Sequence, residues 1–426
     1  MNQTSDARQP QQPQIQLPGC KSLSQRALIL AASGAGQCRL RGLSSCDDSR
    51  FLLQALRDLG VSIDELGADS EGQTAPDFLV SGIGEPPRGN GQVVDVGEAG
   101  SSLRFLLPWC AAGNGEFVLT GAPRLFERPH GDLIDFLTAK GAKIQPVERD
   151  GRPGLRIQSH GLAGGRWQPP CRHSSQYISG LAMAANWLPD VQIEVPKDLP
   201  SRGYFDLTLD ALKAFPGTNP EQWQVPGDPS GATFFLSALA MVGGSMQIGP
   251  DWSMTHPEAQ LLQWFEQSAL LSRQGETWQR VNTSPSQTQI HLDPAPDAGP
   301  ALAVLGAFLP TGLILHGVRR LRIKESDRVL GIQRLLETLG GQATVADDAL
   351  HIEALDPSKL QAIRQQSNLS YHPDGDHRLA MAAGIAQLRV PELQVEQPDC
   401  VAKSFPDFWQ QLSKLATQTS TGSELR

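Results

Sequence analysis

Six segments of the sequence share one pattern, and this repetition limits the possible folds more than any other feature. Each segment opens with small or polar residues and continues into a predicted helix rich in Ala, Leu and Met. The six are KSLSQRALILAA from Lys21, AGSSLRFLLPWCAA from Ala99, SSQYISGLAMAA from Ser174, PSGATFFLSALAMV from Pro229, PDAGPALAVLGAF from Pro296 and GDHRLAMAAGIAQL from Gly375. Their small side chains predict buried helices that pack closely against one another.

A second set of more amphipathic helices alternates with the first. These are DDSRFLLQALRDLG, RPHGDLIDFLTAKG, YFDLTLDALKAF, PEAQLLQWFEQ, SDRVLGIQRLLETLG and FPDFWQQLSKL. Several end at Gly and lead into an alternating strand, as in GVSI and GAKI. Two helices and a few strands therefore recur roughly every 70 residues. Solenoid repeats show closer sequence identity, so we predict an α/β protein of two globular domains with three units each.

The boundary between these domains is predicted near residues 223–227, where a loop rich in Pro and Gly precedes the fourth unit. We assign residues 21–226 to one domain and residues 227–416 to the other. The short strand before Lys21 is expected to join the second of these, so residues 14–20 are assigned with it. Residues 1–13 predict a disordered lead-in, and residues 417–426 predict a loose tail.

Charge and composition exclude several classes of function. The 426 residues include 36 Lys and Arg against 45 Asp and Glu, a net charge of −9, which argues against a nucleic-acid or membrane-surface binder. The apolar stretch 301–318 is interrupted by Pro310-Thr311-Gly312, and the N-terminus lacks a signal pattern, so we expect a soluble cytoplasmic protein. The six cysteines form no C-x-x-C pair and have no nearby His at metal spacing, so no metal or cofactor is predicted.

The stretch RLRIKESDR, which ends at Arg328, places a cation where a predicted helix begins. We predict a strand from Leu313 to Ile323, followed by a helix that Ser326 caps. Arg328 then falls in the first turn, where the helix dipole disfavours a cation by about 0.3–1 kcal/mol. An anion bound at this corner would remove that penalty.

Six further cations lie at predicted helix starts. They are Lys21, Arg26, Arg104, Arg128, Arg378 and Lys403. Small hydroxyl residues and glycines occupy the same corners: Ser22, Ser24, Gly100, Ser101, Ser174, Ser175 and Ser201. Together they indicate a site where helix N–H groups and side-chain cations hold anions. The alternative is local pairing of Glu325 with Arg328, Asp376 with Arg378 and Glu127 with Arg128. No P-loop or dinucleotide-binding motif is present.

Several blocks resemble the EPSP synthase (3-phosphoshikimate 1-carboxyvinyltransferase) family. They are LPGCKSLSQRALILAA, GEAGSSLRFL, LTGAPRLFERPHGDLIDFLTAKGAKI, SSQYISGLAMAA, IKESDR, DHRLAMA and AKSFPDFWQQL, in order over about residues 15–412. The resemblance implies the enolpyruvyl transferase fold, two domains of three βαβαββ units each. It also implies transfer of the enolpyruvyl group of phosphoenolpyruvate to the 5-hydroxyl of shikimate 3-phosphate in the shikimate pathway, by a monomer without cofactor that glyphosate would inhibit.

Matching the blocks assigns roles to individual residues. The resemblance implies that phosphoenolpyruvate is held by Lys21, Gly100, Arg128, Gln176, Arg328, Arg378 and Lys403. It implies that shikimate 3-phosphate is held by Lys21, Ser22, Arg26, Ser174, Ser175, Gln176, Ser201, Asp297 and Lys324, with Arg202 and Tyr204 beside it. Four anionic groups would then meet in one cleft, which explains the gathered cations.

The implied addition–elimination needs a base and an acid. Asp297 is the candidate that accepts the proton of the attacking hydroxyl. Glu325, Lys21 and Lys403 are alternative donors to the methylene carbon on the way to a tetrahedral intermediate, and the sequence does not choose among them. Glu325 lies between cations and should be ionised until bound anions raise its pKa.

Three positions depart from the family pattern. Glu98 replaces an uncharged residue and should repel phosphoenolpyruvate unless Arg104 or another cation neutralises it. Arg320 replaces a common Asn, and Cys20 replaces a common Ser or Ala.

Two rival functions are to be weighed. One rival is the UDP-N-acetylglucosamine enolpyruvyl transferase, whose catalytic Cys is absent from LTGAPRLFERPHG. The other is a non-catalytic relative that binds phosphorylated metabolites, which the presence of Asp297, Glu325 and Lys403 disfavours.

Overall fold

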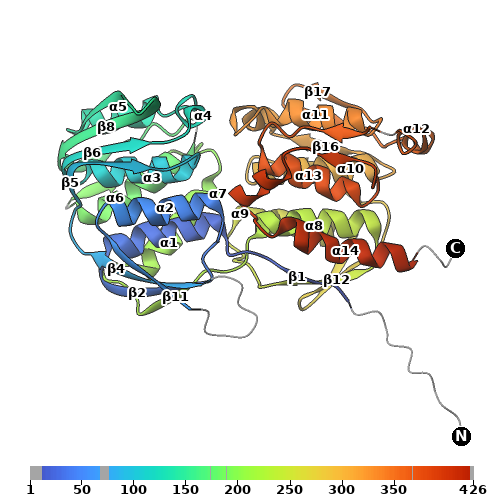
Figure 1. The fold of residues 1–426 in the computed structure, drawn as a ribbon, viewed down its shortest axis with the longest axis horizontal. Helices are drawn as coiled ribbons and strands as arrows, with labels where there is room; N and C mark the ends of the chain where they lie inside the picture. The colour runs from blue at the N-terminus through green and yellow to red at the C-terminus, as the bar shows by residue number, and fades with distance from the viewer. Residues whose placement is uncertain (1–11, 68–75, 173, 189, 367, 423–426) are drawn as a thin grey trace, which may run out of the picture.

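The computed structural model describes residues 12–67, 76–172, 174–188, 190–366 and 368–422. Two lobes lie side by side (Figure 1). We call the lobe that carries helices α1–α7 the first lobe and the lobe that carries α8–α14 the second lobe. Each contains two four-stranded sheets and one two-stranded sheet among the described residues.

The first lobe contains three similar units. The first unit is β11 (Gln222–Gln224), α1 (Lys21–Ser33), β2 (Ala35–Arg41), α2 (Asp47–Asp58), β3 (Ser62–Leu66) and β4 (Asp77–Ile83). The second is β5 (Arg88–Asp95), α3 (Gly100–Ala111), β6 (Asn114–Thr120), α4 (Pro123–Phe126), α5 (Gly131–Ala139), β7 (Lys143–Arg149) and β8 (Arg152–His160). The third is β9 (Gly165–Trp167), α6 (Ser175–Ala184), η1 (Ala185–Trp187), β10 (Val191–Ile193) and α7 (Arg202–Ala214).

The second lobe repeats this order. Its first unit is β1 (Gln14–Gln16), α8 (Pro229–Val242), β12 (Ser245–Gly249), α9 (Pro257–Gln267), β13 (Leu271–Gln274) and β14 (Thr277–Arg280). The second is β15 (Gln289–His291), η2 (Pro296–Ala298), α10 (Gly299–Phe308), β16 (Leu313–His316), η3 (Val318–Ile323), α11 (Arg328–Thr338), β17 (Ala343–Ala346), β18 (Ala349–Ile352) and α12 (Pro357–Ile363). The third is β19 (Ser370–Tyr371), α13 (His377–Gln387), β20 (Gln394–Val395), η4 (Pro398–Lys403) and α14 (Phe408–Gly422).

Every four-stranded sheet has the same pairing pattern. An outer strand runs parallel to the strand that follows the unit's first helix. The unit's last strand pairs antiparallel with that strand on its other side, and the next-to-last strand pairs antiparallel with the last, as in the order β5-β6-β8-β7. The parallel partner requires a helical crossover, which the buried helix of each unit supplies. The predicted α/β class and the predicted set of buried and amphipathic helices are therefore confirmed.

The chain passes between the lobes twice. β1 pairs with β12 of the second lobe, whereas β11 pairs with β2 of the first. The two connecting segments, residues 17–20 and 225–228, are hydrogen-bonded to each other: Cys20 N–H donates to Pro226 O (2.8 Å) and Asp228 N–H donates to Pro18 O (2.9 Å). We call these two paired connecting segments the hinge. The domain boundaries assigned above stay a prediction.

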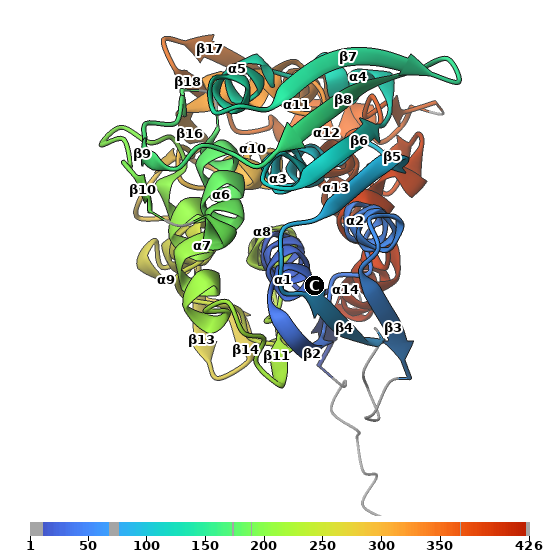
Figure 2. The ribbon, with the colours of Figure 1, turned by 90° about the vertical axis from the view of Figure 1, so that its left-hand side faces the viewer.

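Each lobe has its own hydrophobic core, built around its buried helices. Figure 2 shows α1 and α3 of the first lobe between the β5–β8 sheet and the β2–β4 sheet. Gly180 of α6 illustrates how closely the helices approach, because a Cβ there would lie 2.4 Å from the Arg104 carbonyl oxygen of α3. A larger residue would push α6 away from α3.

Two local predictions at the Arg328 corner are wrong. The strand ends at His316, because Gly317 adopts a left-handed conformation (φ 78°) that turns the chain. Residues 318–323 form a 3₁₀ helix, and the buried Val318 and Leu321 match its period of three rather than a strand. The helix cap is Asp327, whose Oδ1 accepts the N–H groups of the second and third helical residues, and not Ser326.

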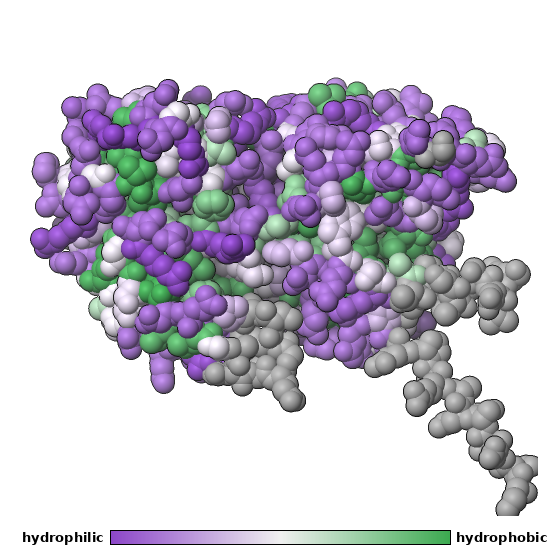
Figure 3. All heavy atoms as spheres, in the orientation of Figure 1, coloured by the Kyte–Doolittle hydropathy of each residue, from purple (hydrophilic) through white to green (hydrophobic). Residues whose placement is uncertain are grey.

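The C-terminal end also differs from prediction. Helix α14 runs from Phe408 to Gly422, so it extends past residue 416, beyond which the sequence predicts a loose tail. Most of the predicted lead-in, residues 1–11, lies outside the described residues, as do residues 423–426. Over the part that is described, no helix combines the length and apolarity needed to cross a membrane. The face in Figure 3 is mainly hydrophilic.

Candidate active site

A polar cavity lies where the two lobes meet, and most of the predicted site residues line it. These are Lys21, Ser22, Arg26, Gly100, Arg128, Ser174, Ser175, Gln176, Ser201, Asp297, Lys324 and Glu325. The other three, Arg328, Arg378 and Lys403, do not line it but contact residues that do or that flank its edge. Residues from separate units of the sequence therefore meet at one place.

The fold brings them together by pointing helix starts at the cavity. Helices α1, α3 and α6 of the first lobe begin at Lys21, Gly100 and Ser175, which all line it. The free N–H groups of a first turn and the helix dipole both favour anions. A Cβ on Gly100 would lie 2.6 Å from the Arg128 Nη1 atom, so this position must be glycine for Arg128 to approach the start of α3.

Arg328, the cation in an unfavourable helix position, is compensated by three carboxylates. Its side chain is 1% exposed and donates to Asp376 Oδ2, Asp297 Oδ1 and Glu325 Oε2, each at 2.8 Å. Burial alone would lower the pKa of Arg328, but these three carboxylates raise it above its ordinary value. Arg328 is therefore a fixed positive charge under the floor of the cavity.

The predicted local pairs are only partly present. Glu325 does pair with Arg328. Asp376 instead caps α13 by accepting the Arg378 N–H (2.9 Å), and the Arg378 guanidinium lies 3.9 Å from Asp297. Arg128 lies 3.9 Å from Glu325 across the lobes. Of the three pairs in the alternative of local pairing, only Glu325 with Arg328 is therefore present among the described residues.

Asp297 lies among cations. Lys324 Nζ is 3.0 Å from its Oδ1, and Arg328 Nη1 is 2.8 Å from the same atom. Burial would raise the pKa of Asp297, but Lys324, Arg328 and Arg378 together hold it well below its usual range. The carboxylate is therefore ionised and can accept a proton once the surrounding positive charge is offset.

Glu325 and Lys21 are also charged in the free protein. Burial opposes ionisation of Glu325, yet Arg328 and Arg128 hold its pKa well below the ordinary value. Burial lowers the pKa of Lys21, but Asp48, whose Oδ2 lies 3.0 Å from Nζ, more than offsets this and the pKa rises. Lys21 therefore carries a proton, whereas Glu325 must gain one before it can donate.

Two predicted cations are bound mainly to protein atoms. Arg26 donates to Thr208 Oγ1 (2.8 Å), Ser22 O (2.7 Å) and Tyr204 O (2.8 Å). Arg104 donates to Gln176 Oε1 (2.7 Å) and Pro129 O (3.1 Å). Both guanidinium groups thus fix neighbouring parts of the cavity wall. Arg104 also does not neutralise Glu98.

The lobes touch at the edge of the site. Lys403 Nζ of the second lobe lies 2.7 Å from Glu98 Oε2 of the first, so the cation that neutralises Glu98 is Lys403. Ser201 Oγ donates to Asp293 O (3.0 Å), and Arg320 donates to Ser201 Oγ. Arg320 therefore holds a predicted site residue in place.

Sequence reasoning missed some residues of this cavity. Gln25, Asp48 and His377 line it and were not selected. His377 is 1% exposed, its Nδ1 has no hydrogen-bond partner among the described residues, and burial with the neighbouring Arg378 keeps its pKa well below the ordinary value. Its place next to Arg378 in the D-H-R block was the available signal. Asp48, in the first turn of α2, is far in sequence from the Lys21 that it holds.

Comparison with known proteins identifies the class. The EPSP synthase from Acinetobacter baumannii is 24% identical, covers 94% of this chain and 95% of its own, and superimposes with a TM-score of 0.71. The enolpyruvyl transferase NikO from Streptomyces tendae is 15% identical with a TM-score of 0.70 and covers 94% of each chain. At these identities the likeness concerns the fold alone, and it confirms the predicted enolpyruvyl transferase fold.

Sequence similarity defines the family. The sequence profile of EPSP synthase (3-phosphoshikimate 1-carboxyvinyltransferase) matches residues 5–219 and 216–412. The 3-phosphoshikimate 1-carboxyvinyltransferases of Xenorhabdus nematophila and Histophilus somni are each 32% identical, and each alignment covers 95% of this chain and 96% of the relative. The chain belongs to the EPSP synthase family, which confirms the predicted resemblance.

Proposed function

We propose that this protein transfers the enolpyruvyl group of phosphoenolpyruvate to the 5-hydroxyl of shikimate 3-phosphate and releases phosphate. The supporting observation is the group of cations that line one cavity, at which the buried helices α1, α3 and α6 begin. Each substrate carries a carboxylate and a phosphate of about −1.5 to −2 charges. A chain of net charge −9 needs such a local positive cluster to hold both.

We assign the two substrates to overlapping sets of residues in and beside this cavity. Phosphoenolpyruvate would contact Lys21, Gly100, Arg128, Gln176, Arg328, Arg378 and Lys403. Shikimate 3-phosphate would contact Lys21, Ser22, Arg26, Ser174, Ser175, Gln176, Ser201, Asp297 and Lys324. Because Arg328 already donates to three carboxylates, only its two remaining N–H groups are available to phosphoenolpyruvate.

Asp297 is proposed to accept the proton of the 5-hydroxyl. In the free protein its carboxylate is a weak base, because Lys324 and Arg328 lower its pKa. The negative charges of the two substrates offset those cations, so the pKa of Asp297 rises when both are bound. The base therefore becomes effective in the ternary complex.

The donor to the methylene carbon is one of three residues. Lys21 already carries a proton, whereas Glu325 must gain one as bound anions raise its pKa. Lys403 is the third candidate. Incorporation of deuterium into the phosphoenolpyruvate methylene in D₂O, measured for Lys21→Met, Glu325→Gln and Lys403→Met, distinguishes them, since only the donor variant loses exchange while both substrates still bind.

The function is tested by phosphate release from phosphoenolpyruvate, with and without shikimate 3-phosphate. The wild type should release phosphate only when shikimate 3-phosphate is present. Asp297→Asn should lose release by at least about 100-fold, the range of a general base. Asp251→Asn, which removes an exposed carboxylate paired with Arg273, is the matched control and should leave the rate unchanged.

Release that does not depend on shikimate 3-phosphate would overturn the proposal. Release driven by UDP-N-acetylglucosamine would support the rival transferase, and binding of both ligands without release would support the non-catalytic relative. Inhibition by glyphosate, a monomeric state and a cytoplasmic location stay predictions of the same proposal.

A further inference from the structure

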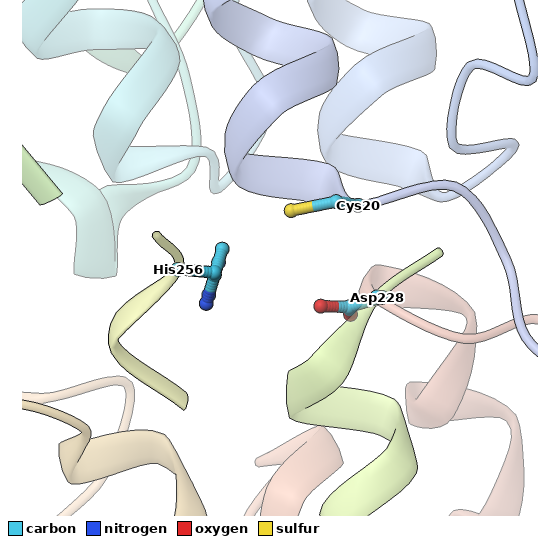
Figure 4. A group of neighbouring side chains, drawn as sticks. All are labelled: Cys20, Asp228 and His256. Atoms are coloured by element: carbon cyan, nitrogen blue, oxygen red, sulfur yellow. The ribbon is translucent and has the colours of Figure 1, made fainter. Parts of the chain in front are cut away.

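A second polar cluster lies at the hinge, outside the cavity described above. Cys20 directly precedes α1, Asp228 caps the start of α8, and His256 directly precedes α9. Cys20 and His256 are 0% exposed, and Asp228 is 3% exposed. One ligand-type atom of each lies within 4.8 Å of the others, and Figure 4 shows Cys20 and Asp228 directed toward the His256 imidazole.

The imidazole is held with one nitrogen free. His256 Nδ1 lies 2.8 Å from Glu258 Oε2 and 3.3 Å from the Glu258 amide nitrogen, and the shorter contact places the ring proton on Nδ1. His256 Nε2 is fully buried and has no hydrogen-bond partner among the described residues. A carboxylate against the second nitrogen of a histidine is the usual surrounding of a metal-ligating imidazole. The Tyr204 hydroxyl donates to the other Glu258 oxygen and holds that carboxylate in turn.

We propose that Cys20, Asp228 and His256 bind a divalent zinc-type metal ion at the hinge. Thiolate, imidazole and carboxylate are the ligands that zinc takes, whereas magnesium and calcium prefer oxygen alone. Metal–ligand bonds of about 2.0–2.3 Å place tetrahedral ligand atoms about 3.3–3.8 Å apart. The three side chains therefore need to move inward by roughly 1 Å from the present separations.

The two anionic ligands offset the charge of the ion. The Cys20 thiol loses its proton to solvent on binding, and the thiolate and the Asp228 carboxylate together neutralise the two positive charges of the ion. His256 ligates through a neutral Nε2, so any proton on that nitrogen also passes to solvent. The Glu258 carboxylate beside Nδ1 adds a further negative charge, which the His256 ring proton faces. An ion paired in this way can be buried at far lower cost than an uncompensated ion.

The place of the site gives the ion a structural effect. Cys20 and Asp228 belong to the two segments that connect the lobes, and His256 begins a helix of the second lobe. A bound ion would link the two connecting segments to each other and to the start of α9, and so restrict movement at the hinge. Sequence spacing could not predict this cluster, because Cys20, Asp228 and His256 lie far apart along the chain.

The test is a cobalt titration of the full chain after reduction and removal of metals by a chelator. Co²⁺ reports tetrahedral geometry by its visible bands and thiolate ligation by a near-ultraviolet band. We expect one equivalent to bind to the wild type, with the thiolate band lost in Cys20→Ser and in His256→Gln and lost also when Zn²⁺ is added. Cys400→Ser, which removes a partly buried thiol elsewhere, should keep the band.

Thermal unfolding supplies a second reading. Zn²⁺ should raise the melting temperature of the wild type and of Cys400→Ser but not that of Cys20→Ser. Cys20→Ser changes a single atom, so the test does not depend on whether His256→Gln folds. Absence of a thiolate band in the wild type, or its persistence in Cys20→Ser, would overturn the proposal. Neither reading uses enzyme activity, so failure here would not bear on the proposed reaction.

Discussion

The ion pair between Glu98 and Lys403 offers the sharpest test of the proposed substrate contacts. Lys403 is assigned to phosphoenolpyruvate, yet its ammonium already lies 2.7 Å from Glu98 Oε2. If both are true, Glu98 competes with the substrate for the same cation. The Glu98→Gln variant removes the competing charge and keeps the size of the side chain.

The expected magnitude follows from exposure. The Lys403 side chain is 10% exposed, but that of Glu98 is 57% exposed, so water screens the pair. Pairs of this kind contribute about 0.2–1 kcal/mol. Release of that energy should lower KM for phosphoenolpyruvate by a factor between about 1.4 and about 5, since 1.4 kcal/mol corresponds to a tenfold change. We expect kcat to stay unchanged, because Glu98 does not contact the reacting atoms.

Steady-state phosphate release at saturating shikimate 3-phosphate measures both constants. The gain in affinity should shrink as KCl is raised, because salt screens the competing charge in the wild type. Glu127→Gln is a matched control: its side chain is 59% exposed and pairs with Arg124 at 2.6 Å, away from Lys403. A KM that rises in Glu98→Gln, or falls equally in Glu127→Gln, would refute the reasoning.

Three further variants test the fold around the site. Arg328→Met should lower the free energy of unfolding, measured in urea, by about 3–5 kcal/mol, because it leaves three carboxylates without their buried partner. The control is Arg334→Met, which removes a half-exposed ion pair and should lower the free energy of unfolding by no more than about 1 kcal/mol. Burial and the charge of a nearby arginine lower the pKa of His130 to about 4, so folding should lose up to about 3 kcal/mol as the pH falls from 6.5 to 4; a pH series in which His130→Gln shows the same slope would contradict this. Gly180→Ala should lower the melting temperature, because overpacking against α3 costs about 1–3 kcal/mol of folding free energy. An unchanged melting temperature in calorimetry would show that α6 can move away from α3 without cost.

The helices could be predicted from the sequence because their signals are local. A buried helix needs small or apolar residues on every side, as in α10, and an amphipathic helix needs one apolar stripe, as in α11. The family blocks also located most of the cavity lining, since each block sits at a helix start that the fold points inward. Repetition of one local pattern was enough to give the architecture.

The failures share a different cause. The end of β16 depended on Gly317, whose N–H and that of Val318 donate to Asp348 O on a neighbouring strand loop. The partner of Arg378 depended on Asp297, which belongs to another unit of the chain. Hydrogen bonds between distant segments decided these cases, and the spacing of residues within one segment carries no information about them.

Arg328 connects the two kinds of evidence. A cation in a first turn signalled an anion site, but the charges that balance it in the free protein are carboxylates of the chain itself. Two of them, Asp297 and Glu325, are the groups proposed to move protons, and Arg328 keeps both ionised. An incoming phosphate or carboxylate that drew on the remaining N–H groups of Arg328 would weaken its hold on these carboxylates and raise their pKa values together. Substrate binding and proton transfer would then be coupled through one buried guanidinium group, and Arg328→Lys, which keeps the charge but not three directed N–H bonds, should lose turnover even where phosphoenolpyruvate still binds.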